Sequence, residues 1–117
     1  MINKRCYYEI EQKDEDKLCI VLRGEIDHHS AVSIRKELDA LICEERPKKA
    51  TLDMSGIDFM DSSGLGLIMG RYALMQKIGG ELTLRSPNER LIKIFKLAGL
   101  QRIIKIEDGK ENEKSNA

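Results

Sequence analysis

Residues 50–85 read ATLDMSGIDFMDSSGLGLIMGRYALMQKIGGELTLR, and this stretch decides the fold. It begins with a short apolar strand at residues 50–54, continues into a helical segment from about Ser62 to Lys77, and ends in a strand at Glu81–Arg85. The Gly79-Gly80 pair stops the helix, because glycine readily adopts the conformation that ends helices. A strand, a helix and a strand in this order predict two parallel strands joined by a crossover.

The same alternation continues on both sides of this stretch. Strand patterns at residues 6–12 and 18–22 flank a charged turn and predict a hairpin, and Gly24 is expected to end its second strand. A helix ended by Pro47 follows, because apolar residues recur at helical spacing: Ala31, Ile34, Leu38, Leu41 and Ile42. After residue 85 we predict a third helix opened by Ser86-Pro87-Asn88 and ended by Gly99, then a last strand at residues 102–106. These elements predict an α/β fold with a mixed, mostly parallel β-sheet packed with α-helices.

The helix from Ser62 carries two apolar stripes. One is predicted to face the core and comprises Leu65, Ile68, Met69, Tyr72 and Met75. The other, formed by Leu67, Leu74 and Ile78, either packs under the neighbouring helix or forms an apolar docking strip beside Ser62. Arg71 and Lys77 are expected on the solvated face.

Length and composition indicate one globular domain. The chain has 117 residues, of which 41% are hydrophobic and 34% are charged. We assign residues 1–106 to the domain. Residues 107–117 contain no apolar residue except the final alanine, and we assign them to a charged C-terminal tail.

The charge balance argues against two classes of partner. The 20 basic and 20 acidic residues give a net charge of zero, whereas proteins that bind nucleic acid or anionic membranes carry an excess of basic residues. No apolar run approaches the roughly 18 residues that span a bilayer, and the N-terminus lacks the apolar segment of a signal peptide. We therefore expect a cytoplasmic protein without a nucleic-acid or membrane partner, monomeric when free.

The most unusual segment is residues 59–66, FMDSSGLG, where an acid and two hydroxyls precede a helix. Either Ser62 or Ser63 caps that helix, or one of them is exposed where another protein can modify it. The loop at residues 24–29 also follows a strand, and the two strands are expected to be parallel neighbours. The two loops are then expected to lie side by side at the carboxyl edge of the sheet, where ligands and partners bind in open α/β folds.

Other possible chemistries have weak signals. The His28-His29 pair could bind a metal, but adjacent side chains rarely chelate one ion well, and a role near the partner surface is favoured. The DMSG sequence at residues 53–56 resembles an element of nucleotide switches, but the chain has no phosphate-binding loop. Cys6, Cys19 and Cys43 are too widely spaced for a metal or redox motif and are expected to be buried thiols. We expect no enzymatic activity, metal or cofactor.

Three segments together resemble a STAS domain: residues 24–29 (GEIDHH), 52–66 (LDMSGIDFMDSSGLG) and 78–81 (IGGE). More narrowly, they resemble the bacterial anti-sigma factor antagonists. The DHH and GRY triplets at residues 27–29 and 70–72 are most similar to the sporulation members that act with sigma-F. The resemblance extends over about residues 6–106.

This resemblance implies a partner-switching protein rather than an enzyme. The unphosphorylated form would bind an anti-sigma factor and release the sigma factor. The anti-sigma factor is also a serine kinase that would phosphorylate Ser62, and a PP2C-type phosphatase would reverse the reaction. The implied partner-binding residues are Gly24, Glu25, Asp27, His28, Asp61, Ser62, Ser63 and Gly64. The alternatives are an antagonist in a general-stress sigma pathway, and a small nucleotide-binding or hydrolytic domain that uses the glycine-rich helix start.

Overall fold

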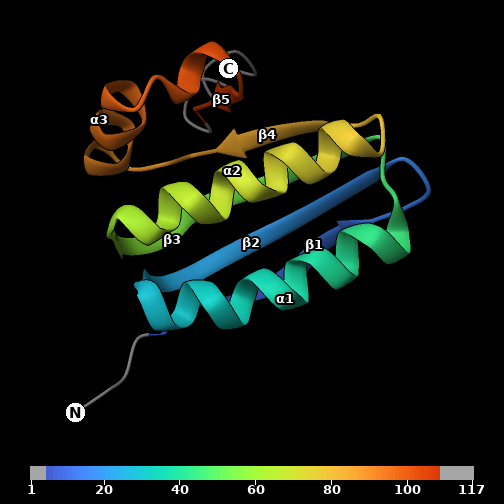
Figure 1. Cartoon of the computed structure of the whole chain (residues 1–117), viewed down its shortest axis with the longest axis horizontal. Coiled ribbons are helices and arrows are strands. Elements are labelled where there is room, and N and C mark those ends of the chain that lie inside the picture. Colours follow the sequence, from blue (N-terminus) through green and yellow to red (C-terminus); the bar gives the residue numbers. More distant parts are fainter. Residues whose placement is uncertain (1–4, 109–117) are drawn as a thin grey trace, which may run out of the picture.

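The computed structural model describes residues 5–108 and confirms the α/β class (Figure 1). The elements in chain order are β1 (Tyr7–Lys13), β2 (Lys17–Ile26), α1 (His28–Glu45), β3 (Lys49–Met60), α2 (Ser62–Lys77), β4 (Glu81–Arg85), α3 (Glu89–Leu97), a 3₁₀ turn η1 (Leu100–Arg102) and β5 (Lys105–Glu107). The five strands form one sheet in the order β1-β2-β3-β4-β5. Among the strands of residues 5–108, only the β1–β2 pair is antiparallel, so the predicted hairpin and the mostly parallel sheet are confirmed.

The core lies between the sheet and two helices. Helices α1 and α2 run side by side over one face of the sheet (Figure 1). Because side chains alternate along a strand, one set of strand residues points under these helices and is at most 1% exposed: Leu18, Ile20, Leu22, Leu52 and Leu84. The other set is more mixed: Lys17, Thr51 and Thr83 are half-buried or exposed, whereas Cys19, Val21 and Asp53 are buried.

Strands β2 and β3 are longer than the sequence predicts. Gly24 does not end β2; its φ of 97° accommodates a bulge, and the strand continues to Ile26. Strand β3 runs on to Met60 rather than ending at residue 54. The physical reason is burial, since Ile26, Ile57 and Met60 are at most 3% exposed and extend the apolar face of the sheet.

The buried face of α2 differs from the prediction at Met69, which is 37% exposed, and at Arg71, which is only 4% exposed. Ile68 and Met75 are buried as predicted, and Leu67, at 3% exposed, packs inside, the first of the two alternatives for its stripe. Arg71 is therefore not on a solvated face. Its Nε lies 2.9 Å from Oδ1 of Asp39 on α1. This contact is an ion pair, but its geometry is not that of a hydrogen bond. Burial lowers the pKa of Arg71, and Asp39 partly offsets this effect.

The C-terminal part contains two smaller corrections. The segment predicted as a strand at residues 102–106 begins with η1, and β5 is confined to Lys105–Glu107. Gly99 adopts φ 74° after α3, consistent with its predicted role as a helix stop. The boundary at residue 106 stays a prediction, because most of the predicted tail, residues 109–117, lies outside the described residues.

The cysteines do not share one environment. Cys19 is buried as predicted, but Cys6 is half-buried and Cys43 is exposed on α1. Burial raises the pKa of the Cys6 thiol to about 12, so this thiol is protonated at neutral pH.

Candidate functional site

Two helices begin next to each other at the carboxyl edge of the sheet. The last residues of β2 and β3, Ile26 and Met60, are paired, and the backbone N–H of Asp61 donates to the carbonyl of Ile26 at 3.1 Å. Each strand is followed at once by a helix, α1 after Asp27 and α2 after Asp61. The expectation that the two loops lie side by side is therefore confirmed.

Asp27 caps α1 in a reciprocal arrangement with Ser30. Its Oδ1 accepts the backbone N–H of Ser30 at 2.8 Å, and the backbone N–H of Asp27 donates to Ser30 Oγ at 2.9 Å. The hydrogen bond from the Ser30 backbone is the main cause that lowers the pKa of Asp27. An exposed, ionised carboxylate is thus held at the start of α1.

Asp61 caps α2, so neither serine does. Its Oδ1 accepts the backbone N–H of Ser63 at 2.8 Å. Ser62 is then the first residue of the helix, and its side chain is exposed. Within residues 5–108 the Ser62 hydroxyl has no hydrogen-bond partner, which leaves it accessible to an external enzyme.

The two residues after Ser62 are less exposed to solvent than Ser62 itself. Ser63 is half-buried and Gly64 is buried. A Cβ at Gly64 would overlap Cγ and Sδ of Met60, the buried last residue of β3. Gly64 therefore allows the start of α2 to lie against the end of β3, which fixes the position of Ser62.

The remaining predicted residues surround these caps. Gly24 and Glu25 lie at the end of β2, where they pair with Ile57 and Phe59 of β3. His28 is exposed in the first turn of α1, and its ring centroid is 5.9 Å from that of His29.

Phe59 is the residue that sequence reasoning did not assign to the site. Its side chain is 50% exposed at the end of β3, three residues before Ser62. An aromatic side chain on this surface offers apolar contact area to a partner. The available signal was its position inside the FMDSSG segment, since aromatic residues are enriched at protein–protein interfaces.

The surroundings of Ser62 are sparse in the described part of the chain. Nothing in residues 5–108 hydrogen-bonds to Ser62 Oγ, whereas an activated serine nucleophile is usually paired with a base. No cluster of three or more potential metal-ligating side chains occurs among residues 5–108. The helices in the described part of the chain are too short or too polar to cross a membrane.

Comparisons with known proteins agree on one family. The STAS domain model matches residues 7–112. The chain is 35% identical over 105 residues to the anti-sigma F factor antagonist of Paenibacillus polymyxa, covering 89% of this chain and 90% of that protein. It is also 35% identical over 95 residues to the anti-sigma-B factor antagonist of Bacillus subtilis, covering 81% and 85%.

Solved structures show the same arrangement. The anti-sigma factor antagonist SpoIIAA in its unphosphorylated form superposes with a TM-score of 0.77 at 28% identity and covers 94% of both chains. The phosphorylated form of Bacillus SpoIIAA superposes with a TM-score of 0.69 at 26% identity, covering 95% of this chain and 100% of that one.

Proposed function

This chain belongs to the STAS domain family, and on that premise we propose that it is an anti-sigma factor antagonist switched off by phosphorylation of Ser62. Its partner is an anti-sigma factor that is also a serine kinase, and a PP2C-type phosphatase restores the unphosphorylated form. The observation that carries the proposal is the exposed Ser62 hydroxyl, free of capping, at the start of α2.

The position of Ser62 explains how a phosphate can be tolerated in the free protein. A phosphoserine adds about −1.5 to −2 charges at neutral pH. At the first residue of a helix, the unpaired backbone N–H groups and the helix dipole favour a negative charge. Phosphorylation is therefore expected to leave α2 folded. The existence of both forms of SpoIIAA as folded structures similar to this chain supports this view.

The same phosphate should oppose partner binding. It would stand beside the carboxylate of Asp61, on the surface that also holds ionised Asp27. Like charges and lost hydration at an interface cost several kcal/mol, and about 1.4 kcal/mol is a tenfold change in affinity. A change in local charge alone can thus release the partner.

We propose the sporulation sigma-F pathway and, as a second candidate, a general-stress pathway. The equal identity of 35% to an anti-sigma F and an anti-sigma-B factor antagonist supports keeping both. Binding assays with the anti-sigma-F and anti-sigma-B factors from the same genome distinguish them, because only the cognate factor should be bound and released on phosphorylation.

The proposal is tested by intact mass after incubation with the anti-sigma kinase and ATP-Mg. Wild type and Ser63→Ala should each gain one phosphate, and Ser62→Ala should gain none. Phosphorylation of Ser62→Ala together with its loss in Ser63→Ala would move the acceptor to Ser63. An unmodified wild type with every anti-sigma kinase of that genome would refute the switch.

Partner affinity gives a second prediction. Ser62→Ala should bind the anti-sigma factor with the affinity of the unphosphorylated wild type. Ser62→Asp should bind at least about tenfold more weakly, because it places a negative charge at the same position. The measurement is titration calorimetry with both variants shown to be folded by circular dichroism. Undiminished affinity of Ser62→Asp would contradict the charge argument.

A further inference from the structure

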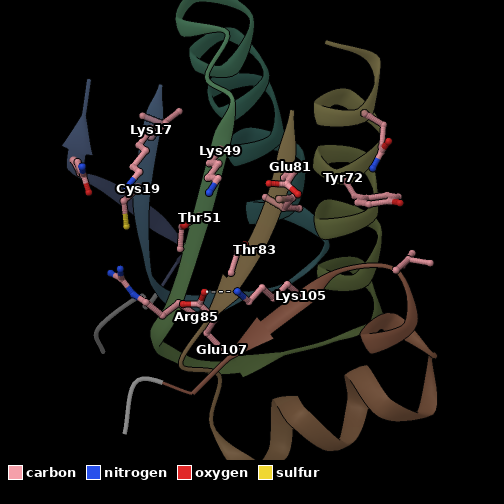
Figure 2. A pocket seen from close by; sticks show the side chains of 15 residues that line it. Lys17, Cys19, Lys49, Thr51, Tyr72, Glu81, Thr83, Arg85, Lys105 and Glu107 are labelled. Atoms are coloured by element: carbon pink, nitrogen blue, oxygen red, sulfur yellow. Dashed lines mark ion pairs between the residues drawn. The ribbon is translucent and has the colours of Figure 1, made fainter. Parts of the chain in front are cut away.

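A groove of about 690 Å³ crosses the sheet from the first residues of β2, β3 and β4 toward β5 (Figure 2). Two residues of α2, Tyr72 and Gln76, line it at the β4 edge of the sheet. Its floor is a row of side chains in register, Cys19, Thr51 and Thr83. None of the residues assigned to the partner-binding surface lines this groove, so a ligand bound here does not depend on the proposed function.

Two lysines stand directly opposite each other on the wall of the groove. Lys17 of β2 is the register partner of Lys49 of β3 (Figure 2). Within the described range neither ammonium forms an ion pair, although the exposed Asp14 carboxylate interacts electrostatically with Lys17; the neighbouring Lys48 is paired with Asp16. Like charges at directly opposed positions of a sheet are destabilising. This local conflict would be relieved by an anion bound between the two lysines.

The floor offers hydroxyl groups for hydrogen bonding. Thr51 and Thr83 are half-buried neighbours in register, and neither hydroxyl has a hydrogen-bond partner among residues 5–108. Together with the two ammoniums in the neighbouring register row, they provide hydrogen-bond donors toward the groove. The groove has the volume of a small-molecule site and convergent polar groups that can orient a ligand, with a lining more polar than is usual for such sites.

The other charged residues of the groove restrict where the anion can sit. Glu81 of β4 is in register with Lys49 and places a carboxylate at one rim. Arg85 is already bound to Asp53 and Glu11, and Lys105 is 3.5 Å from its partner Glu107. The anionic group therefore belongs on the β2 side of Lys49, away from Glu81.

We propose that this groove binds a small hydroxylated organic anion. Its phosphate or carboxylate lies between Lys17 and Lys49, and its hydroxylated body extends over Thr51 and Thr83. The volume of about 690 Å³ accommodates a ligand larger than a bare inorganic ion.

The test is titration calorimetry of the full chain with three probes that share a six-carbon polyhydroxylated body. Glucose 6-phosphate supplies a phosphate, gluconate a carboxylate, and glucose no charge. We expect saturable binding of at least one charged probe and none of glucose. The Lys17→Gln/Lys49→Gln double variant should bind that probe at least about tenfold more weakly, because it removes both charged donors.

A matched double variant controls for the loss of two charges. Lys36 and Lys93 are exposed on α1 and α3 and do not line the groove. Lys36→Gln/Lys93→Gln should bind like wild type, as should Ser62→Ala. The charged probe should also raise the melting temperature of wild type but not of Lys17→Gln/Lys49→Gln, because only a ligand bound to the folded state stabilises it. Absence of saturable binding of both charged probes at 10 mM, or equal weakening in the two double variants, would overturn the proposal.

Discussion

At the scale of single residues, the contact between Gly64 and Met60 sets the position of the acceptor serine. Met60 is 3% exposed, and its Cγ and Sδ occupy the space that a Cβ at Gly64 would need. Gly64→Ala should therefore lower the free energy of unfolding by about 1–3 kcal/mol, the usual effect of overpacking a filled core. The measurement is urea unfolding followed by circular dichroism.

Gly66 is the control for this change. It lies in the same helix, and a Cβ there would meet no described atom within 4 Å. Gly66→Ala should raise stability by about 0.5–1 kcal/mol through helix propensity alone. If Gly64→Ala were as stable as Gly66→Ala, Met60 would be free to move and the glycine would not be needed for packing.

At the scale of the elements, Asp61 has two roles that can be separated. It caps α2 through its bond to the Ser63 N–H, and it contributes a negative charge beside Ser62. Asp61→Ala should lower the free energy of unfolding by about 1 kcal/mol, because an N-terminal N–H loses its partner. Asp61→Asn should leave stability within about 0.5 kcal/mol of wild type, since asparagine caps as well as aspartate. Equal losses in the two variants, measured by urea unfolding, would show that the charge rather than the cap stabilises α2.

The elements also show which features the sequence could predict. The start and end of α2 followed from the serines at one end and the glycine pair at the other, and both are observed. The cap itself was not predicted, because Asp61, Ser62 and Ser63 are all good capping residues and only the backbone course selects among them.

Features that depend on distant residues were predicted less well. A glycine that ends a strand and one that accommodates a bulge look alike in sequence, so Gly24 was misread. The burial of Arg71 depends on Asp39, which lies on another helix. The proximity of the two loops was predictable, because the strand order alone brings the carboxyl ends of β2 and β3 together.

At the scale of the whole molecule, one charged network ties the N-terminal hairpin to the parallel part of the sheet. Arg85 of β4 donates through Nε to Asp53 Oδ2 at 2.7 Å and through Nη2 to both carboxylate oxygens of Glu11 at 2.9 Å. Glu11 is on β1 at a bulge, which directs it across β2 toward Arg85. The network therefore joins β1, β3 and β4 on the face that the helices leave uncovered.

Because of this network, the free energy of unfolding should fall at acid pH. Burial opposes ionisation of Asp53, but hydrogen bonds from Ser55 and Arg85 outweigh it and lower the pKa of the carboxyl. A carboxyl whose pKa is lowered by folding stabilises the protein at pH values above its unfolded pKa of about 3.9. This stability is lost as the pH falls through the lower pKa of the folded state. Asp53→Asn should therefore be about 1–3 kcal/mol less stable than wild type at pH 7. The difference should shrink below about pH 4.

Urea unfolding of both proteins at pH 7 and pH 3 measures this difference directly. Glu37→Gln is the control, because Glu37 is an exposed carboxylate on α1, without an ion pair in the described part of the chain. Glu37→Gln should follow wild type at both pH values, since removing an isolated surface charge changes little. A stability gap between wild type and Asp53→Asn that stays constant from pH 7 to pH 3 would mean that the ionisation of Asp53 does not stabilise the sheet.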